Sequence, residues 1–135
     1  SYGESVATIF SGRGESYFRR METGQLRRIC QTSPKPSVVA LGGGALLCKT
    51  NRNLISRNGT SGYLRCSQKE LLRRLASSAS RPLLRSNAGS KTASKQAISR
   101  LFKSRRQHYE QCDITVLVTN LNPHQSAKCI YEAIS

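Results

Sequence analysis

Residues 37–44 read Ser-Val-Val-Ala-Leu-Gly-Gly-Gly, an apolar run that ends in three consecutive glycines. The run shows no alternation of apolar and polar residues, which is typical of a strand in a parallel sheet covered on both faces. Ligands of open α/β sheets bind beyond the carboxyl ends of the strands, where glycine lets a ligand approach the backbone N–H groups. The run therefore predicts a buried strand over 38–41 and a ligand-binding turn after it. A flexible turn without a ligand is the alternative.

Further strand patterns follow, with helical patterns between them. Residues 62–66 predict a weak strand, and residues 114–118 predict a strong one that is rich in β-branched side chains. Apolar residues at helical spacing predict helices over residues 4–10, 15–30, 49–57, 67–76, 92–109 and 123–134, with a break at 11–14. Strands that alternate with helices indicate an α/β sandwich.

Two of the expected helices begin with recognisable signals. Ser67 and Glu70 have the spacing of a capping box, in which each side chain bonds the backbone N–H of the other residue. Pro123 stands where the first turn of a helix tolerates proline. Residues 77–95, in contrast, are small, polar and basic without either period, so they predict a disordered segment or a functional lid.

Composition narrows the class of protein. The 135 residues carry 22 Lys and Arg against 7 Asp and Glu, a formal net charge of +15, and the length suits a single domain. No apolar run is long enough for a membrane span or a secretion signal. Five cysteines without a close pair indicate reduced thiols in a cytosol. Because the chain begins with Ser1 and its only methionine is Met21, we expect a processed or truncated product.

Arginine outnumbers lysine by 15 to 7. The planar guanidinium fork grips carboxylates and phosphates with two hydrogen bonds, which the lysine ammonium does not do. Since acidic residues are few, most of these arginines lack an internal partner, and we expect anionic ligands. A solvated surface accounts for several of them, and the best binding candidates are Arg19, Arg74, Arg81 and Arg105.

Other function classes have weaker support. The charge suits non-specific nucleic-acid binding, but basic residues are scattered, aromatic residues are sparse and no recognition motif is present. His108 and Cys112 are too few to hold a metal, and the glycosylation sequon at 58–60 is interpreted as a turn. Two histidines and one aspartate do not build a convincing catalytic triad.

An ordered set of motifs resembles the shikimate kinases. It consists of Gly-Glu-Ser-Tyr-Phe-Arg at 14–19 followed by Glu22, the run at 38–45, Leu-Leu-Arg-Arg-Leu at 71–75, Arg-Pro-Leu-Leu at 81–84, and Arg105 with Tyr109. The resemblance covers nearly all 135 residues. It implies an α/β fold of the P-loop nucleoside-monophosphate-kinase type, a parallel sheet with helices on both faces. Residues 1–135 are then a partial shikimate kinase domain, and 77–95 is its lid.

The resemblance also implies an activity and a substrate site. The γ-phosphoryl group of ATP, with Mg²⁺ as cofactor, would pass to the 3-hydroxyl of shikimate, a step in chorismate and aromatic amino-acid biosynthesis. Arg19 and Arg105 would hold the shikimate carboxylate, with Glu22 steadying Arg19. The backbone of Gly42, Gly43 and Gly44 would face the substrate ring. The enzyme would be a cytoplasmic monomer without a specific nucleic-acid or membrane partner.

For the nucleotide, the resemblance implies three further residues. Arg81 in the lid matches the arginine that reaches the transferring phosphate, where it would stabilise the charge of the phosphoryl oxygens. Arg74 matches a residue near adenine and the phosphates. Asn122 falls at the end of a loop, residues 120–122, that borders adenine in this family.

One part of the family pattern is absent. The 135 residues contain neither the phosphate loop, Gly-x-x-x-x-Gly-Lys-[Ser/Thr], nor the Asp-x-Asp strand, and no Lys-Ser or Lys-Thr follows the three glycines at the required spacing. We therefore expect the main ligands of ATP and Mg²⁺ upstream of Ser1 and no catalysis by these residues alone. In the family topology the absent first strand is the shared neighbour of the strands at 38–41 and 62–66. A kinase for another small sugar acid, a basic nucleic-acid-binding module and a non-catalytic remnant are the alternatives.

Overall fold

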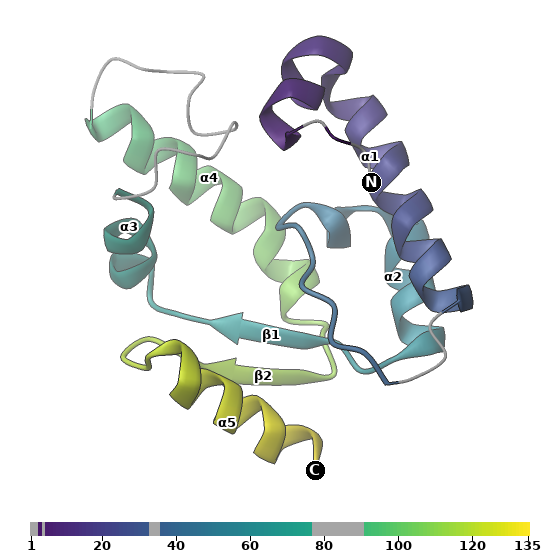
Figure 1. The fold of residues 1–135 in the computed structure, drawn as a ribbon. Helices are drawn as coiled ribbons and strands as arrows, with labels where there is room; N and C mark the ends of the chain where they lie inside the picture. Colours follow the sequence, from purple (N-terminus) through teal and green to yellow (C-terminus); the bar gives the residue numbers. More distant parts are fainter. Residues whose placement is uncertain (1–2, 4, 33–35, 77–90) are drawn as a thin grey trace. The chain divides into compact units, whose positions relative to one another are not determined.

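The computed structural model describes residue 3 and residues 5–32, 36–76 and 91–135. The chain divides into two compact units, residues 1–59 and 60–135 (Figure 1). In the first unit helix α1 (Val6–Thr32) packs against the short 3₁₀ helix η1 (Ala45–Leu47) and against helix α2 (Lys49–Asn58). The second unit contains strand β1 (Gly62–Arg65), helices α3 (Gln68–Ala76) and α4 (Lys91–Tyr109), strand β2 (Ile114–Leu117) and helix α5 (Pro123–Ile134).

The two helices expected in the first 30 residues are present and meet at a kink. Gly14, with φ 80° and ψ 168°, is the non-helical residue within α1. Only glycine adopts such a conformation without strain, because it has no Cβ. The expected break at 11–14 is thus confirmed but is confined to this one residue.

The strand expected over 38–41 is wrong. The structure describes these residues, and they form no strand. Val38 is fully exposed, and Val39 and Leu41 are 41% and 39% exposed. A strand exists only where its backbone N–H and C=O groups pair with a neighbour. In the described part of the chain the sheet has two strands, β1 and β2, so the apolar pattern has no partner strand against which to form.

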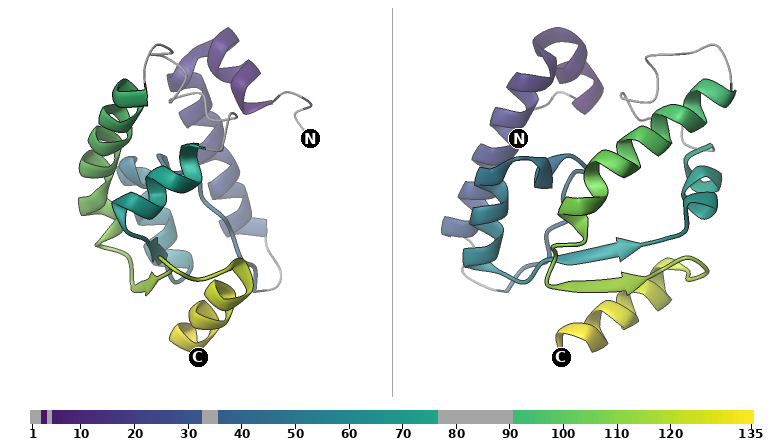
Figure 2. Two further views of the ribbon diagram at one scale, coloured as in Figure 1. Left: turned by 90° about the vertical axis from the view of Figure 1, so that its left-hand side faces the viewer. Right: turned by 180° about the vertical axis from the view of Figure 1, so that it is seen from behind.

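The other two expected strands are confirmed. β1 and β2 pair in parallel, with Gly62 opposite Ile114 and Arg65 opposite Leu117. Since successive side chains point to opposite faces, Tyr63 and Val116 are buried on different faces of the pair. The Tyr63 ring lies 5.2 Å from that of Tyr109 at the end of α4. α5 packs against β2, and the views in Figures 1 and 2 place α4 and α5 on opposite sides of the strands.

All four expected helices after residue 48 are confirmed, with ends within a residue of the prediction. Pro123 begins α5, and Asn122 caps that helix through a reciprocal pair of bonds with Gln125. The capping box at α3 is only half formed. Ser67 Oγ accepts from the backbone N–H of Glu70 at 3.2 Å, but the N–H of Ser67 donates to Thr119 Oγ1 at 3.0 Å.

Glu70 departs from the capping box because arginines compete for its carboxylate. The carboxylate accepts hydrogen bonds from Nε and Nη2 of Arg73, both 2.8 Å long, and from Nε of Arg74 at 2.6 Å. Hydrogen bonds between charged groups are about twice as strong as neutral ones. The bonds from Arg73, and then those from Arg74, lower the pKa of Glu70 from 4.5 to about 2.

This lowered pKa makes the stability of α3 depend on pH in a defined direction. The folded pKa lies below the unfolded one, so the contribution is complete above pH 4.5 and declines as pH falls toward 2. We expect Glu70→Gln to lower the free energy of unfolding at about pH 6, with a difference from wild type that disappears near pH 2. Urea unfolding, followed by tyrosine fluorescence, measures this free energy of unfolding. Glu132→Gln, which removes a carboxylate 3.9 Å from Lys128 Nζ, is the control. A difference that is the same at both pH values would contradict the expectation.

In the part of the chain that the structure describes, no helix is both long and apolar enough to cross a bilayer.

Candidate functional site

The three glycines form a tight turn between the apolar run and α2. The N–H of Ala45 bonds the carbonyl of Gly42 at 2.9 Å, and the N–H of Leu47 bonds that of Gly44 at 3.2 Å. Asn51, fully buried in the first turn of α2, donates from Nδ2 to the Ala45 carbonyl at 2.9 Å. Backbone hydrogen bonds within the turn and a side-chain bond from α2 therefore hold it.

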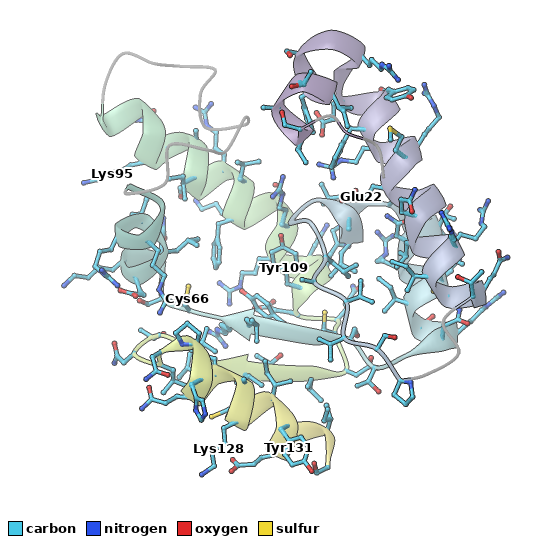
Figure 3. All side chains as sticks on the ribbon, viewed as in Figure 1. Glu22, Cys66, Lys95, Tyr109, Lys128 and Tyr131 are labelled. Atoms are coloured by element: carbon cyan, nitrogen blue, oxygen red, sulfur yellow. The ribbon has the colours of Figure 1, made fainter. Side chains whose placement is uncertain are left out.

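Arg19 and Glu22 form an ion pair one turn apart on α1. Nη1 of Arg19 lies 2.7 Å from Oε2 of Glu22, and their side chains are only 23% and 14% exposed. A looser contact of 3.4 Å joins Nη2 to Oε1 of Glu15. The guanidinium also lies 5.2 Å from the centre of the Phe18 ring. The position of Glu22 on α1 is visible in Figure 3.

This ion pair packs directly on the glycine turn. A Cβ built on Gly44 would lie 2.6 Å from Cζ of Arg19, and one built on Gly42 would lie 2.6 Å from Oε1 of Glu22. Gly44 has φ −103°, a value open to any residue, so a side chain there is opposed by the Arg19 guanidinium, which would have to move, and not by the backbone conformation. The structure thus brings Arg19 together with the turn at 42–44.

Arg105 projects from α4 in the second unit. Its Nε is buried and has no hydrogen-bond partner. Among the described residues, no carboxylate forms an ion pair with Arg105, whereas Arg106 next to it bonds Glu110 at 2.6 Å. Arg19 and Arg105 belong to different units, so their convergence on one ligand stays a prediction.

Arg74 and the segment after β2 lie together within the second unit. Nη2 of Arg74 donates to the carbonyls of Val118 and Leu121 at 3.3 and 3.4 Å, while its Nε bonds Glu70. Asn122, at the end of this segment, uses its side-chain oxygen to cap α5. Arg81 lies outside the described residues, as does most of the expected lid. The last residues of that segment, from Lys91 onward, begin α4.

Three contributors to these contacts were missed by sequence reasoning. Thr119 bonds the backbone of Ser67, 52 residues away, so no local pattern marks it, and Asn51 bonds the carbonyl of Ala45 six residues before it, outside any capping pattern. Cys48 precedes α2, and its pKa is lowered mainly by a hydrogen bond from the backbone N–H of Asn51. The sequence did offer a signal for this effect. The helix predicted over 49–57 begins directly after Cys48, which places the thiol beside the backbone N–H groups of a first helical turn.

The residues that the structure describes do not by themselves form a magnesium site. Within residues 5–32, 36–76 and 91–135, no three His, Cys, Asp or Glu side chains are grouped to hold a metal ion. The phosphate-loop motif, whose hydroxyl binds Mg²⁺, is also absent from the 135 residues.

Comparison with known proteins identifies a family. The family model described as shikimate kinase matches residues 1–135. The shikimate kinase of Chlorobium phaeobacteroides is 38% identical over 117 residues, which are 84% of this chain and 60% of that protein. The shikimate kinase of Cereibacter sphaeroides is 31% identical over 131 residues, 97% of this chain and 62% of that protein. This chain therefore spans about 60% of the length of the curated relatives.

Solved structures agree on the fold. Shikimate kinase from Acinetobacter baumannii in complex with shikimate matches with a TM-score of 0.81 and 29% identity, over 98% of this chain and 71% of that one. Shikimate kinase from Bacteroides thetaiotaomicron matches with a TM-score of 0.82 at 23% identity, over 98% of this chain and 74% of that one. The α/β fold expected from the sequence is confirmed.

Proposed function

Because the chain belongs to the shikimate kinase family, we propose that its residues form the shikimate-binding and lid portion of an enzyme that phosphorylates the 3-hydroxyl of shikimate with ATP. The observation that carries the proposal is the Arg19 guanidinium, held by Glu22 against the backbone of Gly44. A half-buried arginine beside bare backbone is suited to a small ligand that has a carboxylate and several hydroxyl groups.

Within this proposal the two terminal nitrogens of the Arg19 guanidinium, Nη1 and Nη2, have different roles. Nη1 is bound tightly by Glu22, which orients the plane of the guanidinium. Among the described residues the partner of Nη2 is Glu15, at the longer distance of 3.4 Å, so Nη2 is the donor better placed to bond a ligand carboxylate. Glu22 neutralises part of the Arg19 charge, and a second cation is therefore needed to favour an anion. The family resemblance gives this role to Arg105.

The nucleotide half of the proposal rests on the family resemblance. Arg81 would stabilise the charge of the transferring phosphoryl group as the lid at 77–95 closes and excludes water. Arg74 and Asn122, which border the same segment after β2, would flank adenine. ATP and Mg²⁺ would be bound mainly by a phosphate loop outside these residues, and we assign no step to the metal here.

The proposed setting is a cytoplasmic, monomeric enzyme of aromatic amino-acid biosynthesis. The family match supports the pathway, and the location and the monomeric state rest on the family resemblance. The proposed substrate has a single carboxylate, so the site differs from that of a general polyanion binder. The net charge of +15 favours nucleic acid as the competing ligand.

Calorimetric titration of the chain with shikimate tests the proposal. We expect saturable binding to one site, and we expect the methyl ester of shikimate, which lacks the negative charge, to bind roughly 10-fold or more weakly. A DNA duplex titrated at two salt concentrations is the comparison, because phosphate binding weakens steeply with salt. Binding of DNA without binding of shikimate would refute the proposal in favour of the basic module.

A further inference from the structure

Two polar residues occupy the inward face of α4 near its end. Arg105 and His108 are both partly buried, whereas the residues at 103, 104, 106 and 107 are exposed. The two positions continue a helical stripe of inward-facing residues, Ile98, Leu101, Phe102, Arg105 and His108. Tyr109, the last residue of the helix, stacks over β1, as Figure 3 shows. A guanidinium and an imidazole thus stand one turn apart where the helix meets the sheet.

Each of these side chains has one buried atom without a hydrogen bond. The atoms are Nε of Arg105 and Nδ1 of His108, and the surface of both is closed to water. Leaving a buried polar atom unpaired costs free energy, so such atoms are rare in folded proteins and call for an explanation. His124, the second histidine of the chain, is exposed in the first turn of α5 and provides an internal comparison.

The two unpaired atoms are chemically complementary. Arg105 Nε is always a donor, and Nδ1 of a neutral imidazole is an acceptor when the proton is on Nε2. Side chains three residues apart on a helix have Cβ atoms about 5–6 Å apart, within reach of a long arginine side chain. Both atoms are closed to water, and both residues belong to the same inward-facing stripe of α4.

We propose that His108 is a positioning residue for Arg105: in the ligand-bound state its Nδ1 accepts a hydrogen bond from Arg105 Nε. This bond fixes the plane of the guanidinium and directs Nη1 and Nη2 toward the ligand carboxylate. The inference rests on the proposed shikimate site and adds a residue that the family motifs quoted above do not include. It also specifies that the edge of the Arg105 guanidinium formed by Nη1 and Nη2 meets the ligand.

Titration of variant chains with shikimate tests the inference. The variants keep or remove the acceptor at position 108. His108→Leu removes Nδ1, and we expect affinity to fall roughly 5- to 10-fold, the effect of one hydrogen bond to a charged group. His108→Asn places an acceptor close to the Nδ1 position, and we expect affinity within about 2-fold of wild type. His124→Leu should leave affinity unchanged. In an Arg105→Ala background, His108→Leu should have no further effect, because both changes remove the same contact.

Histidine-labelled nuclear magnetic resonance of the wild-type chain provides a reading that does not depend on variants folding. On addition of shikimate, the Nδ1 signal of His108 should shift while that of His124 stays in place. The inference is overturned if Nδ1 does not shift, if His108→Asn loses as much affinity as His108→Leu, or if the His108→Leu loss persists without Arg105. A wild-type chain that binds no shikimate would instead refute the proposed function and, with it, the inference.

Discussion

Shikimate affinity is expected to fall roughly 30- to 150-fold when Arg19 is replaced by alanine, a loss of about 2–3 kcal/mol in binding free energy. The change removes the donor at Nη2 and leaves the Glu22 carboxylate, which is only 14% exposed, without its 2.7 Å partner. An unpaired carboxylate beside the site also repels the carboxylate of the ligand. Calorimetric titration of the variant against wild type measures the effect.

Two matched variants distinguish the two-pronged hydrogen bonding of the Arg19 guanidinium from its positive charge. Arg19→Lys keeps the positive charge but not the two-pronged donor, so it should recover only part of the affinity. Arg20→Ala removes a neighbouring positive charge on the exposed side of α1, where Arg20 lies 5.8 Å from the Tyr17 ring, and it should bind as wild type does. Equal losses for Arg19→Ala and Arg20→Ala would indicate a general charge effect and contradict a defined site.

Valine in place of Gly44 should weaken shikimate binding to a similar extent, although no charged residue is replaced. A Cβ there would lie 2.6 Å from Cζ and 2.8 Å from Nη1 of Arg19, so the guanidinium must move away from the turn. The backbone at Gly44 suits any residue, and the far end of an arginine is flexible. We therefore expect affinity to fall roughly 30-fold or more, while the midpoint of urea unfolding changes little.

Two further variants test the cause of that loss. Gly24→Ala adds a Cβ on the exposed side of α1 with nothing within 4 Å, and it should leave binding intact while stabilising the helix by about 0.5–1 kcal/mol. Arg19→Ala combined with Gly44→Val should bind no worse than Arg19→Ala alone, because both remove the same guanidinium from the site. Additive losses in the double variant would mean that Gly44 acts independently of Arg19.

The sequence patterns were reliable where the structural cause was local. β-branched residues at 114–118 and Pro123 before an apolar helical stripe each predicted the element that formed. The pattern at 38–41 failed because burial of a strand depends on a neighbour, and no described strand pairs with these residues. Glu70 failed as a capping residue because the two arginines that follow it compete more strongly for its carboxylate.

In the candidate site, too, the sequence identified the residues but not their long-range contacts. Chain order and motif spacing singled out Arg19, Arg105 and the glycines at 42–44, since the family resemblance rests on the identity and sequence of those residues. Chain order could not show that Arg19 and Glu22 pack against Gly44 and Gly42, because this contact joins α1 to a turn that meets it only after folding.

Residue identity and periodicity alone thus specified the helices, the two paired strands and the arginines available for an anion, because backbone preference and side-chain chemistry are properties of short segments. Tertiary packing decided which strand pattern found a partner, which carbonyls after β2 are bonded by Arg74, and that the Arg19–Glu22 pair lies against the turn at 42–44. Those outcomes depend on distances between segments far apart in the chain, which no local pattern contains.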